Sequence, residues 1–174
     1  SAVGFKNNID GAVMVAVNAI RSASSANSFI SVTDEGKVAV FRTEGNPHCH
    51  VILRGGKSPN YDKDSVSKCE GELEKAGLPS NIMIDCSHGN SNKNHENQGL
   101  VLEKIAEQIE EGNQSIIGVM IESNLKEGNQ PIPDDLSDLS YGVSVTDACI
   151  SWESTEELLR GFATRVSASL KNRI

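Results

Sequence analysis

The chain has 174 residues with a net charge of −8 at pH 7, and 37% of its residues are hydrophobic. That length suits one domain with a sizeable core. The negative charge argues against nucleic-acid or anionic-membrane partners, and no apolar run is long enough to span a bilayer.

Apolar or alternating runs predict β-strands at residues 2–6, 28–32, 37–41, 50–55, 81–87, 115–123 and 141–150. Helical patterns occupy residues 10–23, 62–77, 98–112 and 151–173. Asp10 is the expected cap of the first helix, and Ser154 and Glu157 have capping-box spacing in the last. The last four main strands begin roughly 25–35 residues apart, the size of one βα unit, so we expect a parallel α/β sheet.

Two segments interrupt this alternation of strands and helices. The pair 28–32 and 37–41 is joined by the short loop TDEGK, which predicts a β-hairpin inserted at about residues 28–42. The stretch 126–140 contains two prolines and an acidic cluster. We expect a long loop there, and long loops in compact domains are usually functional or mobile.

Chemically active side chains follow the expected strands. In parallel α/β folds the carboxyl ends of the strands meet on one rim, where ligands bind. His88, Glu122 and Asp147 stand at three such ends, and one imidazole with two carboxylates suits manganese, iron or zinc. Taken singly, each residue also fits a structural histidine or a solvated carboxylate, so both interpretations stay open.

Cations gather at the same expected rim. Arg54, Gly55, Gly56 and Lys57 suggest a phosphate site, because glycine N–H groups can approach an anion and Arg offers a planar fork. The alternative is a tight turn with surface cations. Lys6 would add a second cation at a strand end, and a buried cation needs a partner such as a bound anion.

The four cysteines lie far apart and form no CxxC pair, which predicts reduced thiols in the cytoplasm. Cys86 lies two residues before His88 and shares its strand face, so it can ligate a metal, although small core filling is favoured. Cys69 and Cys149 are interpreted as packing residues.

Long motifs then point to one family. They are GFKN, ILRGGKSPNY, GLPSNIMIDCSHGNSNK, GVMIESNLKEGNQ and YGVSVTDACISWE. From about Val3 to about Val166 the chain resembles the class I 3-deoxy-D-arabino-heptulosonate 7-phosphate (DAHP) synthases, transferases of the shikimate pathway to aromatic amino acids. The resemblance implies a (β/α)8 TIM barrel. It also implies a metal-dependent condensation of phosphoenolpyruvate with D-erythrose 4-phosphate.

The resemblance also implies roles for single residues. Lys6, Arg54 and Lys57 would bind substrate, with Lys6 and Arg54 on phosphoenolpyruvate. The implied metal ligands are His88, Glu122 and Asp147, with His88 beside phosphoenolpyruvate and Asp147 near the sugar aldehyde. The catalytic set would be Lys6, Arg54, His88 and Asp147, and the metal manganese, iron, zinc or cobalt.

The inserted hairpin resembles the element that binds a feedback inhibitor in this family. Phe29, Ser31 and Phe41 fall at its pocket positions. The implied effector is an aromatic amino acid, phenylalanine or tyrosine.

A complete barrel needs roughly 250 residues, so residues 1–174 are expected to form the C-terminal half of one barrel domain. We expect this half to be inactive alone, to lack the family's fourth metal ligand, and to form a homo-oligomer. One alternative is a non-catalytic fragment that binds an effector or a partner half. Another is a related synthase that joins phosphoenolpyruvate to a different sugar phosphate.

Overall fold

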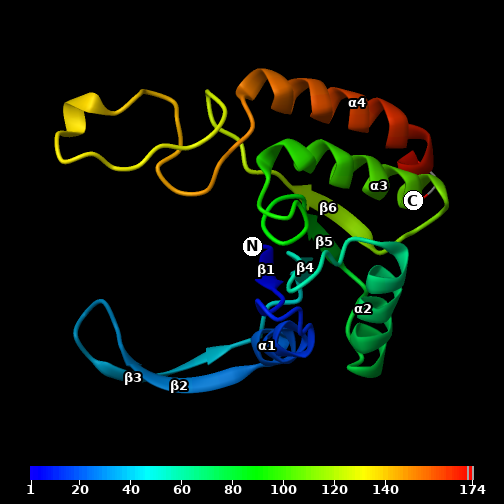
Figure 1. Cartoon of the computed structure of the whole chain (residues 1–174). Helices are drawn as coiled ribbons and strands as arrows, with labels where there is room; N and C mark the ends of the chain where they lie inside the picture. Colours follow the sequence, from blue (N-terminus) through cyan, green and yellow to red (C-terminus); the bar gives the residue numbers. More distant parts are fainter. Residues whose placement is uncertain (172, 174) are drawn as a thin grey trace.

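A four-stranded parallel sheet lies at the centre of the computed structural model, which describes residues 1–171 and 173 (Figure 1). The strands are β1 (Val3–Lys6), β4 (Cys49–Leu53), β5 (Ile82–Asp85) and β6 (Ile116–Met120), paired in the order β1-β4-β5-β6. The predicted parallel α/β sheet is therefore confirmed. Residue 172, inside the last predicted helix, lies outside the described residues.

The main helices are α1 (Met14–Ser24), α2 (Lys63–Lys75), α3 (Gln98–Glu110) and α4 (Trp152–Lys171). Two short 3₁₀ turns, η1 (His95–Asn97) and η2 (Leu136–Asp138), complete the helical elements of the described residues. All four helices contribute to one core, which also contains Val51, Leu53, Ile82 and Ile84 of the strands. None of these helices combines the length and the apolarity needed to cross a membrane.

Alternation along the strands separates this core from the candidate site. Side chains of successive strand residues point to opposite faces, so Val51 and Ile84 face the helices while Ile52 and Asp85 lie on the other face. Gly4 belongs to this second face, since a Cβ added there would meet the side chains of Ile52 and His50. Lys6, two residues along β1, shares that face at the carboxyl end of the strand.

Local sequence explains α2 and α3. The side chain of Asp62 caps α2 by accepting a hydrogen bond from Ser65 N at 2.9 Å. The predicted apolar stripe of α3, formed by Leu102, Ile105 and Ile109, is buried as expected. Gly112 follows α3 with φ +100°, a conformation that favours glycine at a helix end.

Two predicted caps were wrong. Asp10 Oδ1 accepts a hydrogen bond from Ala12 N at 2.8 Å and closes a turn, while α1 begins only at Met14. Ser154 lies inside the first turn of α4, where its N–H donates to Ser151 Oγ at 3.2 Å. Ser151 therefore caps α4, because the helix begins at Trp152, three residues earlier than the capping-box spacing suggested.

The strand predicted at 141–150 was also wrong. This segment makes only isolated bridges, in which Ser144, Cys149 and Ile150 pair with Asn129, Gly128 and Ser123 respectively. Its backbone bonds are divided between Glu122 and Asn124, just beyond β6, and the loop that follows, so no continuous ladder forms. The apolar alternation of the segment was real, but its neighbours are too short and irregular to extend it.

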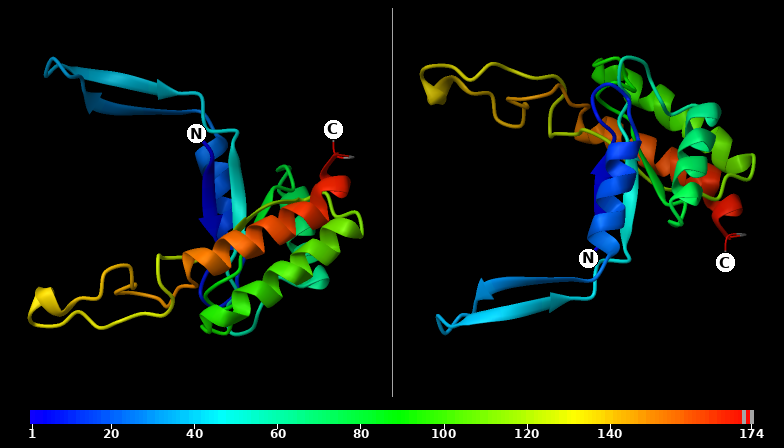
Figure 2. Two further views of the ribbon diagram at one scale, coloured as in Figure 1. Left: turned by 90° about the horizontal axis from the view of Figure 1, so that it is seen from above. Right: turned by 90° about the horizontal axis from the view of Figure 1, so that it is seen from below.

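The predicted hairpin is present as β2 (Asn27–Val32) and β3 (Val38–Thr43), an antiparallel pair. Figures 1 and 2 show that it projects from the body on the same side as the long loop that contains residues 126–140. The expected long loop is thus confirmed, with η2 as its one helical turn among the described residues. These two arms flank the open side of the molecule.

Glycines let the loops at the carboxyl end of the sheet pack backbone against backbone. Gly55 has φ +75°, and a Cβ on it would lie 2.5 Å from the carbonyl carbon of Gly89. A Cβ on Gly56 would lie 2.5 Å from Gly11 N. The N–H of Gly89 also donates to Arg54 O at 3.0 Å. The loops after β1, β4 and β5 are therefore locked together beside the rim.

We predict opposite effects for two Gly→Ala substitutions in this chain. Gly55→Ala should lower the free energy of unfolding by more than about 1 kcal/mol, because it adds both strain and a backbone clash. Gly71→Ala, inside α2 with no atom near its added Cβ, should raise it by about 0.5–1 kcal/mol. Urea unfolding followed by circular dichroism measures both, and equal midpoints would contradict the loop-packing account.

Candidate functional site

A cleft of about 250 Å³ opens at the carboxyl ends of the strands. Its lining residues are Arg54, Ser87, His88, Gly89, Lys93, His95, Glu122, Asp147 and Ala148. Four of the predicted site residues therefore meet here, although they are spread over more than ninety positions of the chain. We call this the rim cleft.

His88, Glu122 and Asp147 form a compact donor cluster in the rim cleft. One ligand atom from each lies within 4.8 Å of the others. His88 Nε2 is 3.5 Å from Glu122 Oε1 and 3.6 Å from Asp147 Oδ2. An imidazole nitrogen and two carboxylate oxygens at this spacing fit a divalent transition-metal ion.

Glu122 is held at both its backbone and its side chain. The fully buried Gln98 accepts from Glu122 N at 2.8 Å and donates to Glu122 O at 3.0 Å. Ser87 Oγ donates to Glu122 Oε2 at 2.8 Å. The other carboxylate oxygen of Glu122, Oε1, therefore faces His88. Neither Gln98 nor Ser87 was predicted as a site residue, because only their partners in the fold reveal this role.

The buried carboxylate of Asp85 supports the other side of the cluster. Its Oδ1 accepts from Ser87 N at 2.9 Å, and its Oδ2 lies 2.9 Å from Lys6 Nζ. His88 Nδ1 is also 2.9 Å from Oδ2, although the ring is not aligned for a hydrogen bond. The partner of Lys6 is therefore Asp85, where the sequence suggested a bound anion.

The predicted glycine cradle for a phosphate was wrong. The N–H groups of Arg54 and Gly55 donate to the side-chain oxygens of Asn7 and Asn60, at 2.8 and 2.7 Å. Gly56 N donates to Ser58 O at 2.9 Å. All three donors are used within the protein, so the alternative of a tight turn holds, and the cation that this turn brings to the rim cleft is the side chain of Arg54.

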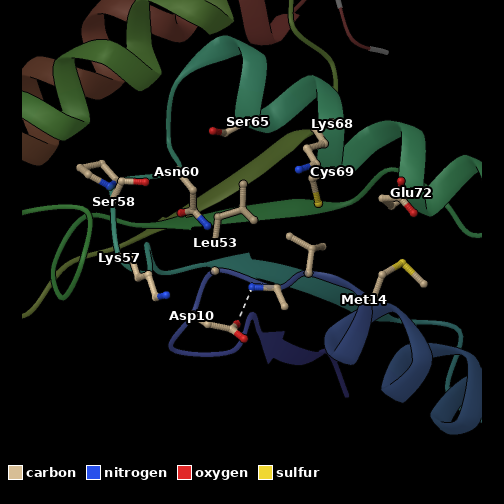
Figure 3. Close-up of a pocket in the computed structure, with 14 residues that line it drawn as sticks. Asp10, Met14, Leu53, Lys57, Ser58, Asn60, Ser65, Lys68, Cys69 and Glu72 are labelled. Atoms are coloured by element: carbon tan, nitrogen blue, oxygen red, sulfur yellow. Dashed lines mark hydrogen bonds between the residues drawn. The ribbon is translucent and has the colours of Figure 1, made fainter.

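Lys57 lies apart from the other predicted substrate ligands. It lines a separate cleft of about 440 Å³ between the start of α1 and α2. Figure 3 shows Lys57 there near Asp10, with Cys69 and Glu72 on the far side. In its place, Lys93 and His95 reach the rim cleft. Their only local signal was their position just after the run SHGNSN.

The cysteines are buried in the protein. Cys86 has no exposed surface and belongs to the core, and burial, with a smaller effect of Asp85, raises its pKa to about 12. Burial likewise raises the pKa of Cys69 to about 12. The packing role interpreted for Cys69 and favoured for Cys86 is confirmed, whereas Cys149 is buried but lies outside the core cluster.

The hairpin brings its three predicted effector residues onto one face. Phe29 and Phe41 are opposite in the register, and their rings stack at 5.8 Å between centroids. Ser31 follows Phe29 by two residues and so shares its face. None of the three lines the rim cleft.

Comparisons with known proteins agree on one family. Residues 1–160 match the family described as the DAHP synthetase I family. The Tyr-sensitive phospho-2-dehydro-3-deoxyheptonate aldolase of Salmonella typhimurium is 53% identical over 172 residues, covering 99% of this chain and 48% of that protein. The phenylalanine-inhibited aldolase of Saccharomyces cerevisiae is 52% identical over 171 residues, covering 94% of this chain and 46% of that protein.

A solved structure shows the same similarity. The phospho-2-dehydro-3-deoxyheptonate aldolase of Francisella tularensis superimposes with a TM-score of 0.88 at 47% identity, covering 97% of this chain and 49% of that one. The chain therefore spans about half the length of these relatives.

We predict that Cys69 and Cys86 resist iodoacetamide at about pH 8 in the folded chain and react after unfolding in urea, because the thiolate is the reactive form. Folding raises both thiol pKa values from 9.0 to about 12. Their contribution to stability is therefore full below pH 9.0 and is lost as the pH rises toward about 12. Peptide mapping by mass spectrometry identifies the modified thiols, and rapid alkylation of native Cys86 would contradict its packing role.

Proposed function

This chain belongs to the DAHP synthetase I family, and we propose that it supplies about half of an enzyme that condenses phosphoenolpyruvate with D-erythrose 4-phosphate to give DAHP and phosphate. The observation that carries the proposal is the meeting of Arg54 with the donor cluster of His88, Glu122 and Asp147 in one cleft. Relatives named phospho-2-dehydro-3-deoxyheptonate aldolase support the choice of reaction.

The donor cluster fits the metal dependence that we propose. A divalent ion such as manganese, iron, zinc or cobalt, held by His88, Glu122 and Asp147, would act as a Lewis acid toward the aldehyde oxygen of the sugar. Ser87 and Gln98 restrict Glu122 before any ion arrives.

The chain's cations would orient phosphoenolpyruvate. Arg54 offers a planar fork for its phosphate or carboxylate, and Lys6 a second positive charge on the same rim. Fixing the substrate in this way would aim its methylene carbon at the aldehyde carbon, where the new carbon–carbon bond forms. Water then adds to the phosphoenolpyruvate carbon that carries the phosphate, and phosphate leaves from that carbon.

We further propose that residues 1–174 are the C-terminal half of a (β/α)8 barrel, with the hairpin as an insertion. Among the described residues β1 pairs only with β4, and beyond β6 the sheet continues as one bridge, Ser123 to Ile150. The helices pack on one face of the sheet, whereas parallel sheets are usually covered on both. Assembly with the remaining half and with further copies would cover these surfaces.

The test is an enzyme in which this chain replaces the matching half of the Salmonella typhimurium relative. We expect this chimeric enzyme to form DAHP, to lose activity with a chelator, and to regain it with manganese. The 174-residue chain alone should give no detectable turnover, because we expect the fourth metal ligand to come from the other half of the barrel. A chimera that folds but makes no DAHP with any of the four metals would overturn the proposal.

We also propose that the hairpin binds an inhibitory aromatic amino acid at Phe29, Ser31 and Phe41. Ser31→Leu should fill the space beside the stacked rings and raise the concentration of tyrosine or phenylalanine that halves activity at least tenfold. Ser28→Leu is the matched control, because Ser28 lies on the same strand but the opposite face. Inhibition curves of the chimeric enzyme measure both, and equal shifts in the two variants would argue against this pocket.

A further inference from the structure

We propose that Asp85 is a positioning residue that couples the metal donor His88 to the anion-binding cation Lys6. This inference rests on the proposed function and adds a residue to it. One carboxylate oxygen, Asp85 Oδ2, lies 2.9 Å from both Lys6 Nζ and His88 Nδ1. The two functional groups are thus joined through a single buried atom.

The burial of Asp85 makes this arrangement demanding. Its side chain has no exposed surface, and a buried carboxylate is costly unless charges and hydrogen bonds compensate it. Ser87 N satisfies Oδ1 at 2.9 Å, while Lys6 and His88 are the positive or potentially positive groups at Oδ2. Ordinary core filling would place an apolar residue at this position.

Asp85 is placed where it can orient the ring of His88. Nδ1 is buried and has no hydrogen-bond partner among the residues that the structure describes, and Asp85 Oδ2 lies within reach. A turn of the imidazole would align Nδ1–H with this oxygen. Nε2 then presents its lone pair toward Glu122 and Asp147, which is the usual way a carboxylate orients a metal-binding histidine.

Asp85 constrains Lys6 in the same way. An ammonium has three donors, and the bond to Asp85 takes one, which holds Nζ at the rim and leaves two. The Lys6 side chain is 35% exposed, so an anion can approach it from solvent. Losing the Asp85 charge would therefore disturb metal binding and anion binding together, which a residue with a purely structural role would not do selectively.

The test compares Asp85→Asn with Glu70→Gln in the chimeric enzyme. Asp85→Asn keeps the shape and removes the charge, so zinc affinity measured by calorimetry should fall 10- to 100-fold. The KM for phosphoenolpyruvate should rise, and combining it with Lys6→Met should raise KM no further. Glu70→Gln also removes a carboxylate charge, but Glu70 accepts a hydrogen bond from Asn113 Nδ2 at 3.0 Å and does not line the rim cleft, so zinc affinity and KM should stay near those of the parent.

The outcomes separate this inference from the proposed function. Unchanged zinc affinity and KM in Asp85→Asn, with only a lower melting temperature, would reduce Asp85 to a structural role. If the parent chimera makes no DAHP, the proposed function fails, while zinc affinity still tests Asp85. If Asp85→Asn does not fold, nitrogen NMR of the zinc-loaded parent decides: a protonated, protected His88 Nδ1 supports the inference, and an unprotonated Nδ1 overturns it.

Discussion

The buried charge of Asp85 is the constraint on which the rim of this sheet depends. Lys6 must reach it from β1, two strands away, because β4 lies between β1 and β5. Adjacent strands are about 4.8 Å apart, so only a long side chain on the same face can span that gap. The strand order, the register and the choice of lysine are thus linked by one ion pair, and His88 Nδ1 lies 2.9 Å from the same carboxylate oxygen.

Most of the fold could be predicted because its signals are local. Apolar runs with turn residues between them located β1, β4, β5 and β6, and the TDEGK loop located the hairpin. The segment 141–150 has a similar alternation, yet it forms no strand, since a strand depends on a continuous neighbour and not on its own pattern. Asp10 failed as a cap for a related reason, because an Asx turn competes for the same side-chain oxygen.

The metal donors of the candidate site could be predicted from the sequence, but the residues that hold them in place could not. His88, Glu122 and Asp147 stand at strand ends or just beyond, where topology makes side chains converge. A pair of glycines such as Gly55 and Gly56 is typical of an anion-binding loop. Here the absence of a Cβ instead allows their backbone to pack against that of Gly89 and Gly11. Such contacts join loops that are distant in sequence, so no local pattern reports them. Lys57 was predicted to bind substrate together with Gly55 and Gly56. The turn that these glycines form places Lys57 in the second cleft instead.

The three metal donors differ in how firmly the protein holds them. The side chains of His88 and Glu122 are 18% and 25% exposed, whereas that of Asp147 is 70% exposed. Asp147 comes from the segment whose backbone bonds to Gly128 and Gln130, at the start of the long loop. An ion that binds His88, Glu122 and Asp147 together would therefore fix this loop to the rim. The hairpin shares no residue with the rim cleft, so such an ion would not fix it in the same way.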